Sequence, residues 1–157
     1  MPFATPDPQR GPAHDTRSRP GVARQRTNGH YEPMDDDPKS IVLAMYDRLN
    51  THDLDGSYDL FAEDILYTGW SEFRGVAEAR DANETFFKGV PDHWRRVERL
   101  LVDGDVVATW VTLGGTPTVN GTPFEIEFCN VIEVRDGEIK SIRMYADWPS
   151  LASKVSA

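Results

Sequence analysis

The stretch Phe124-Glu-Ile-Glu-Phe-Cys-Asn-Val-Ile-Glu-Val-Arg-Asp-Gly-Glu-Ile-Lys-Ser-Ile-Arg-Met-Tyr-Ala-Asp147 carries the strongest structural pattern in the chain. Its residues alternate between two chemically different sets, which is the period of an extended strand with two faces. Asp136-Gly137 then predicts a tight hairpin turn, and a second strand is expected from residue 139 to about 147. One face would carry Phe124, Ile126, Phe128, Asn130, Ile132 and Val134, and the other Glu125, Glu127, Cys129, Val131 and Glu133.

Upstream of this hairpin lie two further strand patterns, at 93–102 and 106–114, joined by a turn at Asp103-Gly104. Asp37-Pro38 is typical of a helix start, and apolar residues at helical spacing follow it to about residue 49. The remaining predicted elements are helices over 57–62 and 75–88, a strand over 65–70 and a short closing helix over 149–155. Together they predict an α+β domain: a cone-shaped, curved antiparallel sheet packed on about three helices, which together form an α+β barrel. A pocket is expected between the concave face of the sheet and the first helix.

The composition limits the possible partners. The 157 residues carry a net charge of −9, which argues against nucleic acid as a partner. A single cysteine rules out an internal disulfide, and no apolar run is long enough to span a membrane. No secretory signal is apparent, so a cytoplasmic location is predicted. The chain lacks a P-loop, a Gly-rich dinucleotide turn and metal-spaced His or Cys pairs, so no cofactor or metal is expected.

Residues 1–36 differ from the rest of the chain. Prolines alternate there with Gly, Arg and Thr, and neither a helical nor a strand period appears, which predicts a disordered extension. The first 30 residues hold five arginines against two aspartates, so a tail that binds nucleic acid or another partner is the alternative. No aromatic residues are interleaved with the arginines, which favours a plain extension. The folded domain is expected to span 37–157.

Four segments resemble the nuclear-transport-factor-2-like superfamily. They are 41–64, Phe73-Arg-Gly75, Val102-Asp-Gly-Asp105 and Val134-Arg-Asp-Gly-Glu-Ile139. The resemblance covers about residues 38–155 and is greatest to ketosteroid isomerases, SnoaL-like polyketide cyclases and limonene-1,2-epoxide hydrolases. It implies a domain that is usually a homodimer through its sheet, with an apolar pocket for a ring-bearing small molecule. The motifs specify the fold better than the reaction, because the superfamily hosts many chemistries.

The same resemblance implies that most of the catalytic groups of these enzymes are replaced in this chain. The catalytic tyrosine of the ketosteroid isomerases falls at Met45, their general-base aspartate at Gly69 and their oxyanion-hole aspartate at Cys129. The acid of the SnoaL-like cyclases falls at Met144. Only the water-positioning tyrosine of the epoxide hydrolases is matched, by Tyr67.

If Cys129 faces the pocket, as the resemblance implies, the two-residue period places Glu127 and Val131 on the same face. Tyr67, His93 and Glu127 are then the candidate catalytic residues. A carboxylate beside an imidazole gives a general base, and a tyrosine hydroxyl donates to an oxygen as charge develops there. Asn83 and Arg95 are further candidates for substrate contact at the rim. The expected substrate-binding wall consists of Met45, Gly69, Phe86, Trp110, Cys129, Val131 and Met144.

The hairpin pattern by itself favours the opposite orientation, with Phe124 and Phe128 in the core and the glutamates in solvent. The resemblance instead assigns the phenylalanine face to a dimer interface. Each of these residues also fits a purely structural role. His93 fits a position in a loop, Tyr67 fits a packed aromatic residue on a strand, and Cys129 fits a small apolar residue that fills space.

Two functional hypotheses follow from these observations. The first is a cofactor-independent cyclase, isomerase or epoxide-opening enzyme that acts by general acid–base chemistry on a polyketide- or terpenoid-like substrate. The second is a non-catalytic member that binds a hydrophobic ligand or forms a dimeric interaction module. It is suggested because the catalytic positions of the family are occupied by apolar residues here, namely Met45, Gly69, Cys129 and Met144. The expected partners are a hydrophobic small molecule and a second copy of the chain.

Overall fold

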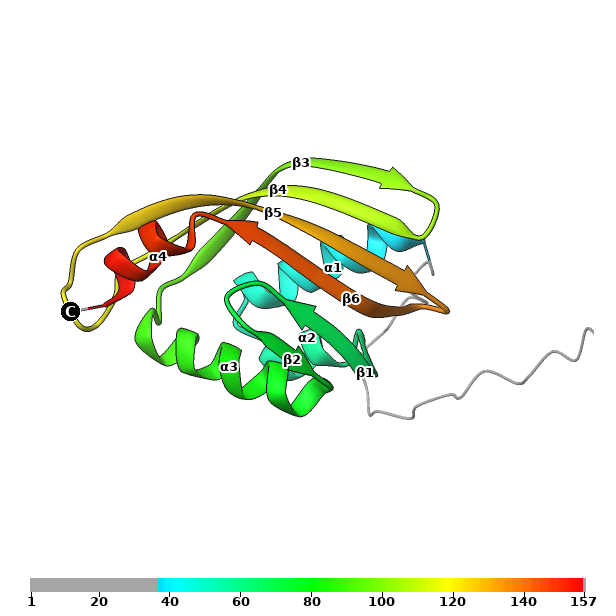
Figure 1. Ribbon diagram of the computed structural model, residues 1–157, viewed down its shortest axis with the longest axis horizontal. Coiled ribbons are helices and arrows are strands. Elements are labelled where there is room, and N and C mark those ends of the chain that lie inside the picture. Colours follow the sequence, from blue (N-terminus) through cyan, green and yellow to red (C-terminus); the bar gives the residue numbers. More distant parts are fainter. Residues whose placement is uncertain (1–36, 157) are drawn as a thin grey trace, which may run out of the picture. The chain divides into compact units, whose positions relative to one another are not determined.

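A computed structural model describes residues 37–156, and Figure 1 shows a curved sheet with its helices gathered along one face. The predicted extension over residues 1–36 lies outside the described residues. In the described part of the chain, no helix is long and apolar enough to cross a membrane. The elements in order are α1 (Pro38–Asn50), α2 (Leu54–Tyr58), β1 (Phe61–Thr68), β2 (Glu72–Arg74), α3 (Val76–Gly89), β3 (Trp94–Asp103), β4 (Val106–Gly115), β5 (Phe124–Arg135), β6 (Glu138–Ala146) and α4 (Trp148–Val155).

Helix α1 begins at the predicted cap. The Asp37 side chain accepts a hydrogen bond from the backbone N–H of Ser40 at 3.1 Å, and Pro38 opens the helix. The apolar stripe packs on the sheet, with Ile41 and Val42 fully buried. Burial of each large apolar side chain contributes about 1.5–3 kcal/mol.

Helix α2 begins and ends earlier than predicted from the sequence. The Asp53 side chain accepts a hydrogen bond from Gly56 N at 2.9 Å, and this cap starts the helix at Leu54. The chain is therefore free to enter β1 at Phe61 rather than at Ile65.

The sheet has six strands in the order β2-β1-β6-β5-β4-β3. The predicted antiparallel meander is confirmed from β3 to β6. β1 differs from the prediction because it runs parallel to β6, with Tyr67 opposite Ile142. The connection from β1 to β6 runs through β2, α3 and the strands β3 to β5, and a long connection of this kind allows parallel pairing that a short hairpin does not. The short β2, which the sequence pattern does not predict, folds back on β1, so the sheet is mixed.

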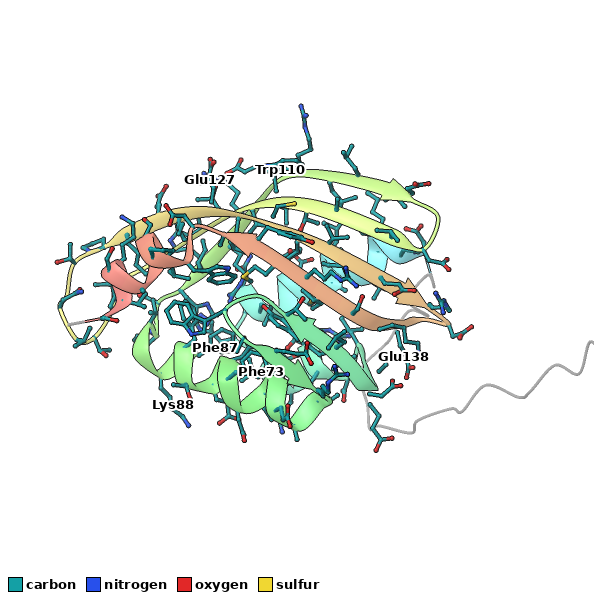
Figure 2. All side chains as sticks on the ribbon, viewed as in Figure 1. Phe73, Phe87, Lys88, Trp110, Glu127 and Glu138 are labelled. Atoms are coloured by element: carbon teal, nitrogen blue, oxygen red, sulfur yellow. The ribbon has the colours of Figure 1, made fainter. Side chains whose placement is uncertain are left out.

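The two faces of β5 are oriented as the alternating pattern favours. Phe124, Phe128 and Asn130 are buried on the inner face, which the helices cover, whereas Glu127 is exposed on the outer face. In Figure 2, Glu127 and Trp110 lie on the side of the sheet away from α3. The opposite orientation would leave phenylalanine rings in water and glutamates in the core. The assignment of the phenylalanine face to a dimer interface, and of Glu127 to the pocket, is therefore wrong.

Candidate functional site

An apolar cavity of about 350 Å³ lies between the inner face of the sheet and the helices, which is the size of a site for a small organic molecule. Neither a carboxylate nor an imidazole lines it. The lining residues are Met45, Tyr46, Leu49, Ser57, Tyr58, Phe61, Tyr67, Trp70, Phe73, Ala82, Asn83, Thr85, Phe86, Arg95, Leu113, Phe128, Asn130, Ile142, Met144, Trp148, Leu151 and Val155.

A buried hydrogen-bonded group stands on the sheet side of the cavity. The Tyr46 hydroxyl lies 2.8 Å from Thr109 Oγ1 and accepts a hydrogen bond from Asn130 Nδ2 at 2.9 Å. Burial raises the pKa of Tyr46, against the opposing effect of these two hydrogen bonds. The other amide atom, Asn130 Oδ1, is buried without a hydrogen-bond partner in the described part of the chain. Buried polar atoms are usually paired, so this oxygen is an unsatisfied polar atom in a residue that lines the cavity.

Two other tyrosines line the cavity in different surroundings. The Tyr58 hydroxyl accepts a hydrogen bond from Asn83 Nδ2 at 2.9 Å, and burial raises the pKa of Tyr58 to about 12. The Tyr67 hydroxyl has no hydrogen-bond partner within residues 37–156. Burial also raises the pKa of Tyr67, although the positive charge of Arg95 opposes this effect. Both hydroxyls are therefore protonated near neutral pH, and the one on Tyr67 is free to donate.

Arg95 on β3 brings a positive charge to this apolar cavity. The Asn50 side chain holds its backbone, accepting from Arg95 N at 2.7 Å and donating to Arg95 O at 2.8 Å. The guanidinium group donates to His93 Nδ1 at 3.2 Å and lies over the ring of Phe87, 5.3 Å from its centroid. No carboxylate in the described part of the chain forms an ion pair with it. Burial lowers the pKa of Arg95, but an arginine keeps its charge in proteins.

His93 supports Arg95 and does not line the cavity. Its ring is buried against Phe87, with the centroids 4.0 Å apart, and against His52, with the centroids 4.6 Å apart. Gly115 leaves room for this segment, because a Cβ atom there would approach the Cα of His93 to 3.1 Å. Burial, followed by the charge of Arg95, lowers the pKa of His93 to about 4. The neutral ring accepts from Arg95 through Nδ1, since arginine has donors only, and its proton is on Nε2.

The structure separates the three candidate catalytic residues. Tyr67 lines the cavity, His93 lies behind Arg95, and Glu127 projects from the outer face beside Thr112 of β4. The expected carboxylate–imidazole pair therefore does not form, because the two side chains lie on opposite faces of the sheet.

The expected substrate-binding wall is divided in the same way. Met45, Phe86 and Met144 line the cavity. The outer face instead carries Trp110, Cys129 and Val131, which alternate with inward-facing neighbours along β4 and β5. Gly69 does not line the cavity, because the position of its missing side chain is occupied by Trp148 and Met144.

Sequence reasoning missed Tyr46 and Asn130. Each directly follows a residue, Met45 or Cys129, that the family comparison treated as a catalytic position. Met45 lines the cavity, but on β5 the comparison selected the outward-facing neighbour of Asn130. A signal was present in the hairpin, because Asn130 is the one polar residue among the apolar residues of its strand face. A polar side chain on an apolar strand face usually has a buried partner or a function.

No group of three His, Cys, Asp or Glu side chains within residues 37–156 is arranged to hold a metal ion. The polar atoms that face the cavity, from tyrosine, asparagine and arginine, are suited instead to hold the oxygen atoms of an organic molecule.

The fold and its cavity are those of the nuclear-transport-factor-2-like, or ketosteroid-isomerase-like, class of proteins. The model of the SnoaL-like domain matches residues 42–142, and the chain belongs to this family. No curated protein sequence matches the chain.

Several solved structures share the fold at low sequence identity. An NTF2-like protein of unknown function from Burkholderia pseudomallei has a TM-score of 0.72 and 16% identity over 79% of this chain and 100% of its own. A proposed SnoaL-like polyketide cyclase from Jannaschia sp. CCS1 has a TM-score of 0.70 and 19% identity over 83% and 99%. AclR, a proposed hydroxylase from Streptomyces galilaeus, has a TM-score of 0.68 and 20% identity over 75% and 94%. These TM-scores establish the common fold, whereas identities this low do not establish a common reaction.

Proposed function

We propose that the protein is a cofactor-independent enzyme that binds a polyketide- or terpenoid-like ring compound in the cavity and promotes a cyclisation, isomerisation or epoxide opening. The main support is the unpaired hydroxyl of Tyr67, within electrostatic reach of the Arg95 charge in an otherwise apolar cavity. Donors and charges held in a site that excludes water stabilise negative charge on a substrate oxygen. The similarity to a proposed polyketide cyclase supports the class of substrate through the fold alone.

The step assigned to this cavity is the stabilisation of a developing oxyanion. When a proton leaves the carbon beside a carbonyl group, the electron pair moves to the oxygen, which receives the hydrogen bond of Tyr67 and faces Arg95. The lining residues include no general base, so the proton passes to water at the mouth of the cavity or to a basic group of the substrate. His93 is a poor base for this step, because its Nδ1 is occupied and its pKa is lowered to about 4.

Exchange of the α-protons of 2-tetralone for deuterium, followed by proton NMR in D2O, tests this proposal. The wild-type protein is expected to accelerate exchange over buffer alone. Tyr67→Phe should reduce the acceleration about 10²-fold, which is typical for the loss of an oxyanion-hole donor. Tyr145→Phe is the matched control, because Tyr145 is 58% exposed on the outer face. Equal rates for the wild type and Tyr67→Phe would contradict the assignment of Tyr67.

The second candidate is a non-catalytic ligand-binding protein of the same fold. The observation that favours it is the lack of a carboxylate or imidazole among the residues that line the cavity. Binding of 2-tetralone without accelerated exchange would support this candidate over the enzyme.

We also propose that the outer face of the sheet forms a homodimer interface, as the resemblance to the family implies. Large apolar side chains are exposed on this face, including Leu101 at 56% and Trp110 at 48%. Apolar side chains gathered on one face favour a protein partner over solvent.

A further inference from the structure

We infer that the cavity selects ligands that carry an ionised oxygen on an apolar ring system, and that Arg95 is the residue that binds this oxygen. The oxygen belongs to a carboxylate or to an acidic enol or phenol. The inference rests on the proposed function only in placing the ligand in this cavity.

The first argument is charge balance. Arg95 lines the cavity, and no described carboxylate forms an ion pair with its guanidinium group. Tyr58 and Tyr67 do not neutralise the charge, because burial raises the pKa of both hydroxyls and keeps them protonated. His93 is neutral as well. The cavity therefore contains an uncompensated positive charge, which a ligand anion would neutralise.

The second argument is that the guanidinium group is held in place. Asn50 fixes the backbone of Arg95 through two hydrogen bonds, His93 Nδ1 accepts from Nη1, and Phe87 packs against the guanidinium plane. A guanidinium group has five N–H donors, and only Nη1 has a partner in the described part of the chain. The remaining N–H groups can donate two hydrogen bonds to a planar oxyanion.

The third argument is the cost of the arrangement without a ligand. An unpaired charge in apolar surroundings loses hydration, and a folded protein usually keeps such a charge paired. The neighbouring Arg96 shows the alternative, since it points outward and pairs with Glu98 at 2.7 Å. The cavity arginine lacks such a partner, and a bound anion would supply one.

Two pairs of probes test the charge preference at pH 7. The first pair is 2-hydroxy-1,4-naphthoquinone, an acidic enol, and its neutral 2-methoxy ether. The second pair is 2-naphthoate and the neutral 2-naphthamide. Calorimetry should show that the wild-type protein binds the anion of at least one pair about tenfold or more tightly than the neutral member, as expected for a hydrogen-bonded charge pair. The pair with the larger preference identifies the enol or the carboxylate as the favoured group.

Arg95→Gln should abolish this preference while the affinity for the neutral members changes by less than about threefold, because only the charge pair is lost. Arg95→Lys should retain part of the preference. Arg96→Gln is the matched control and should bind all four probes as the wild type does. Preference that survives in Arg95→Gln, or equal affinities within both pairs for the wild type, would overturn the inference. If the neutral probes bind in that case, the proposed function still stands. If none of the four probes binds, both the inference and the proposed function are contradicted.

A second readout needs only the wild-type protein. The visible absorbance of 2-hydroxy-1,4-naphthoquinone reports its ionisation, so its pKa can be titrated when free and when bound. Arg95 should lower the pKa of the bound enol, because a nearby positive charge favours the ionised form. An unchanged or raised pKa on binding would overturn the inference without recourse to any variant.

Discussion

The inner and outer faces of β5 differ in almost every property, although their residues alternate along a single strand. The inner face buries Phe124 and Phe128 and places Asn130 at the cavity. The outer face exposes Glu127 and presents Cys129 beside Trp110 of the neighbouring strand. Because side chains alternate strictly along a strand, a shift of one residue exchanges the two faces completely. A site can therefore be assigned to this strand only when its orientation is known.

Removing a ring from the inner face should have the largest effect. Phe128→Ala leaves a cavity in the core and should reduce the free energy of unfolding by about 3–5 kcal/mol. Cys129→Ala, one residue away on the outer face, should change it by less than about 1 kcal/mol. Urea denaturation followed by circular dichroism measures both values. Similar losses for the two variants would mean that the strand does not separate a core face from an outer face.

Acid should destabilise the protein through the buried imidazole of His93. The pKa of His93 is lowered to about 4, against 6.5 in the unfolded chain, so between these pH values only the unfolded state binds the proton. This contribution to stability is complete above pH 6.5 and is lost as the pH falls towards 4. It amounts to at most about 3 kcal/mol.

The test is the free energy of unfolding measured at pH 7, 5.5 and 4. His93→Gln should lose less stability over this range than the wild type, because it lacks the titrating ring. Glu127→Gln on the outer face serves as the control and should follow the wild-type curve. A steep acid response in His93→Gln that equals the wild-type response would contradict the neutral, buried state of His93.

Breaking the buried hydrogen-bonded group should have an intermediate effect. Tyr46→Phe leaves Thr109 and Asn130 without the hydroxyl they contact and should destabilise the protein by about 1–3 kcal/mol. Tyr145→Phe removes the same atom from an exposed outer ring and should cost less than about 0.5 kcal/mol. Thermal unfolding compares the two variants, and equal melting temperatures would argue against the Tyr46 network.

A charge on the outer face should alter assembly and leave the fold almost unchanged. Trp110→Glu should convert the proposed dimer to a monomer in sedimentation velocity, because the carboxylate would be buried against apolar surface. Its effect on the unfolding of each chain should stay within about 0.5 kcal/mol once association is accounted for. A wild-type monomer, or a variant that remains dimeric, would contradict the proposed interface.

Local signals in the sequence were sufficient for most of the fold. The cap at Asp37, the apolar stripe of α1 and the Asp136-Gly137 turn all form as predicted. The parallel pairing of β1 with β6 was not predictable, because it depends on contacts between segments about 75 residues apart rather than on local periodicity.

The candidate site was predicted less well, for a physical reason. Tyr67, a candidate taken from a family motif, lines the cavity, and the alternation in β5 separated its faces correctly. Comparison with the catalytic positions of distant relatives then assigned the site to the wrong face of β5. An offset of one residue is a small error in a sequence comparison, but it exchanges the two faces of a strand. The proposed role of Arg95 depends on the lack of an ion pair with any carboxylate of residues 37–156, which only the three-dimensional arrangement reveals.

The central claim, that ligands bind at the inner face, is tested most directly by NMR with a reporter on each face. Met45 and Met144 line the cavity, and Cys129, the single cysteine of the chain, lies on the outer face. Carbon-13 methyl groups on the methionines and an S-methylthio label on Cys129 report ring-current shifts when 2-hydroxy-1,4-naphthoquinone is added. The account predicts saturable shifts of the Met45 and Met144 signals and a constant Cys129 signal. A shift of the Cys129 label with unchanged methionine signals would contradict it.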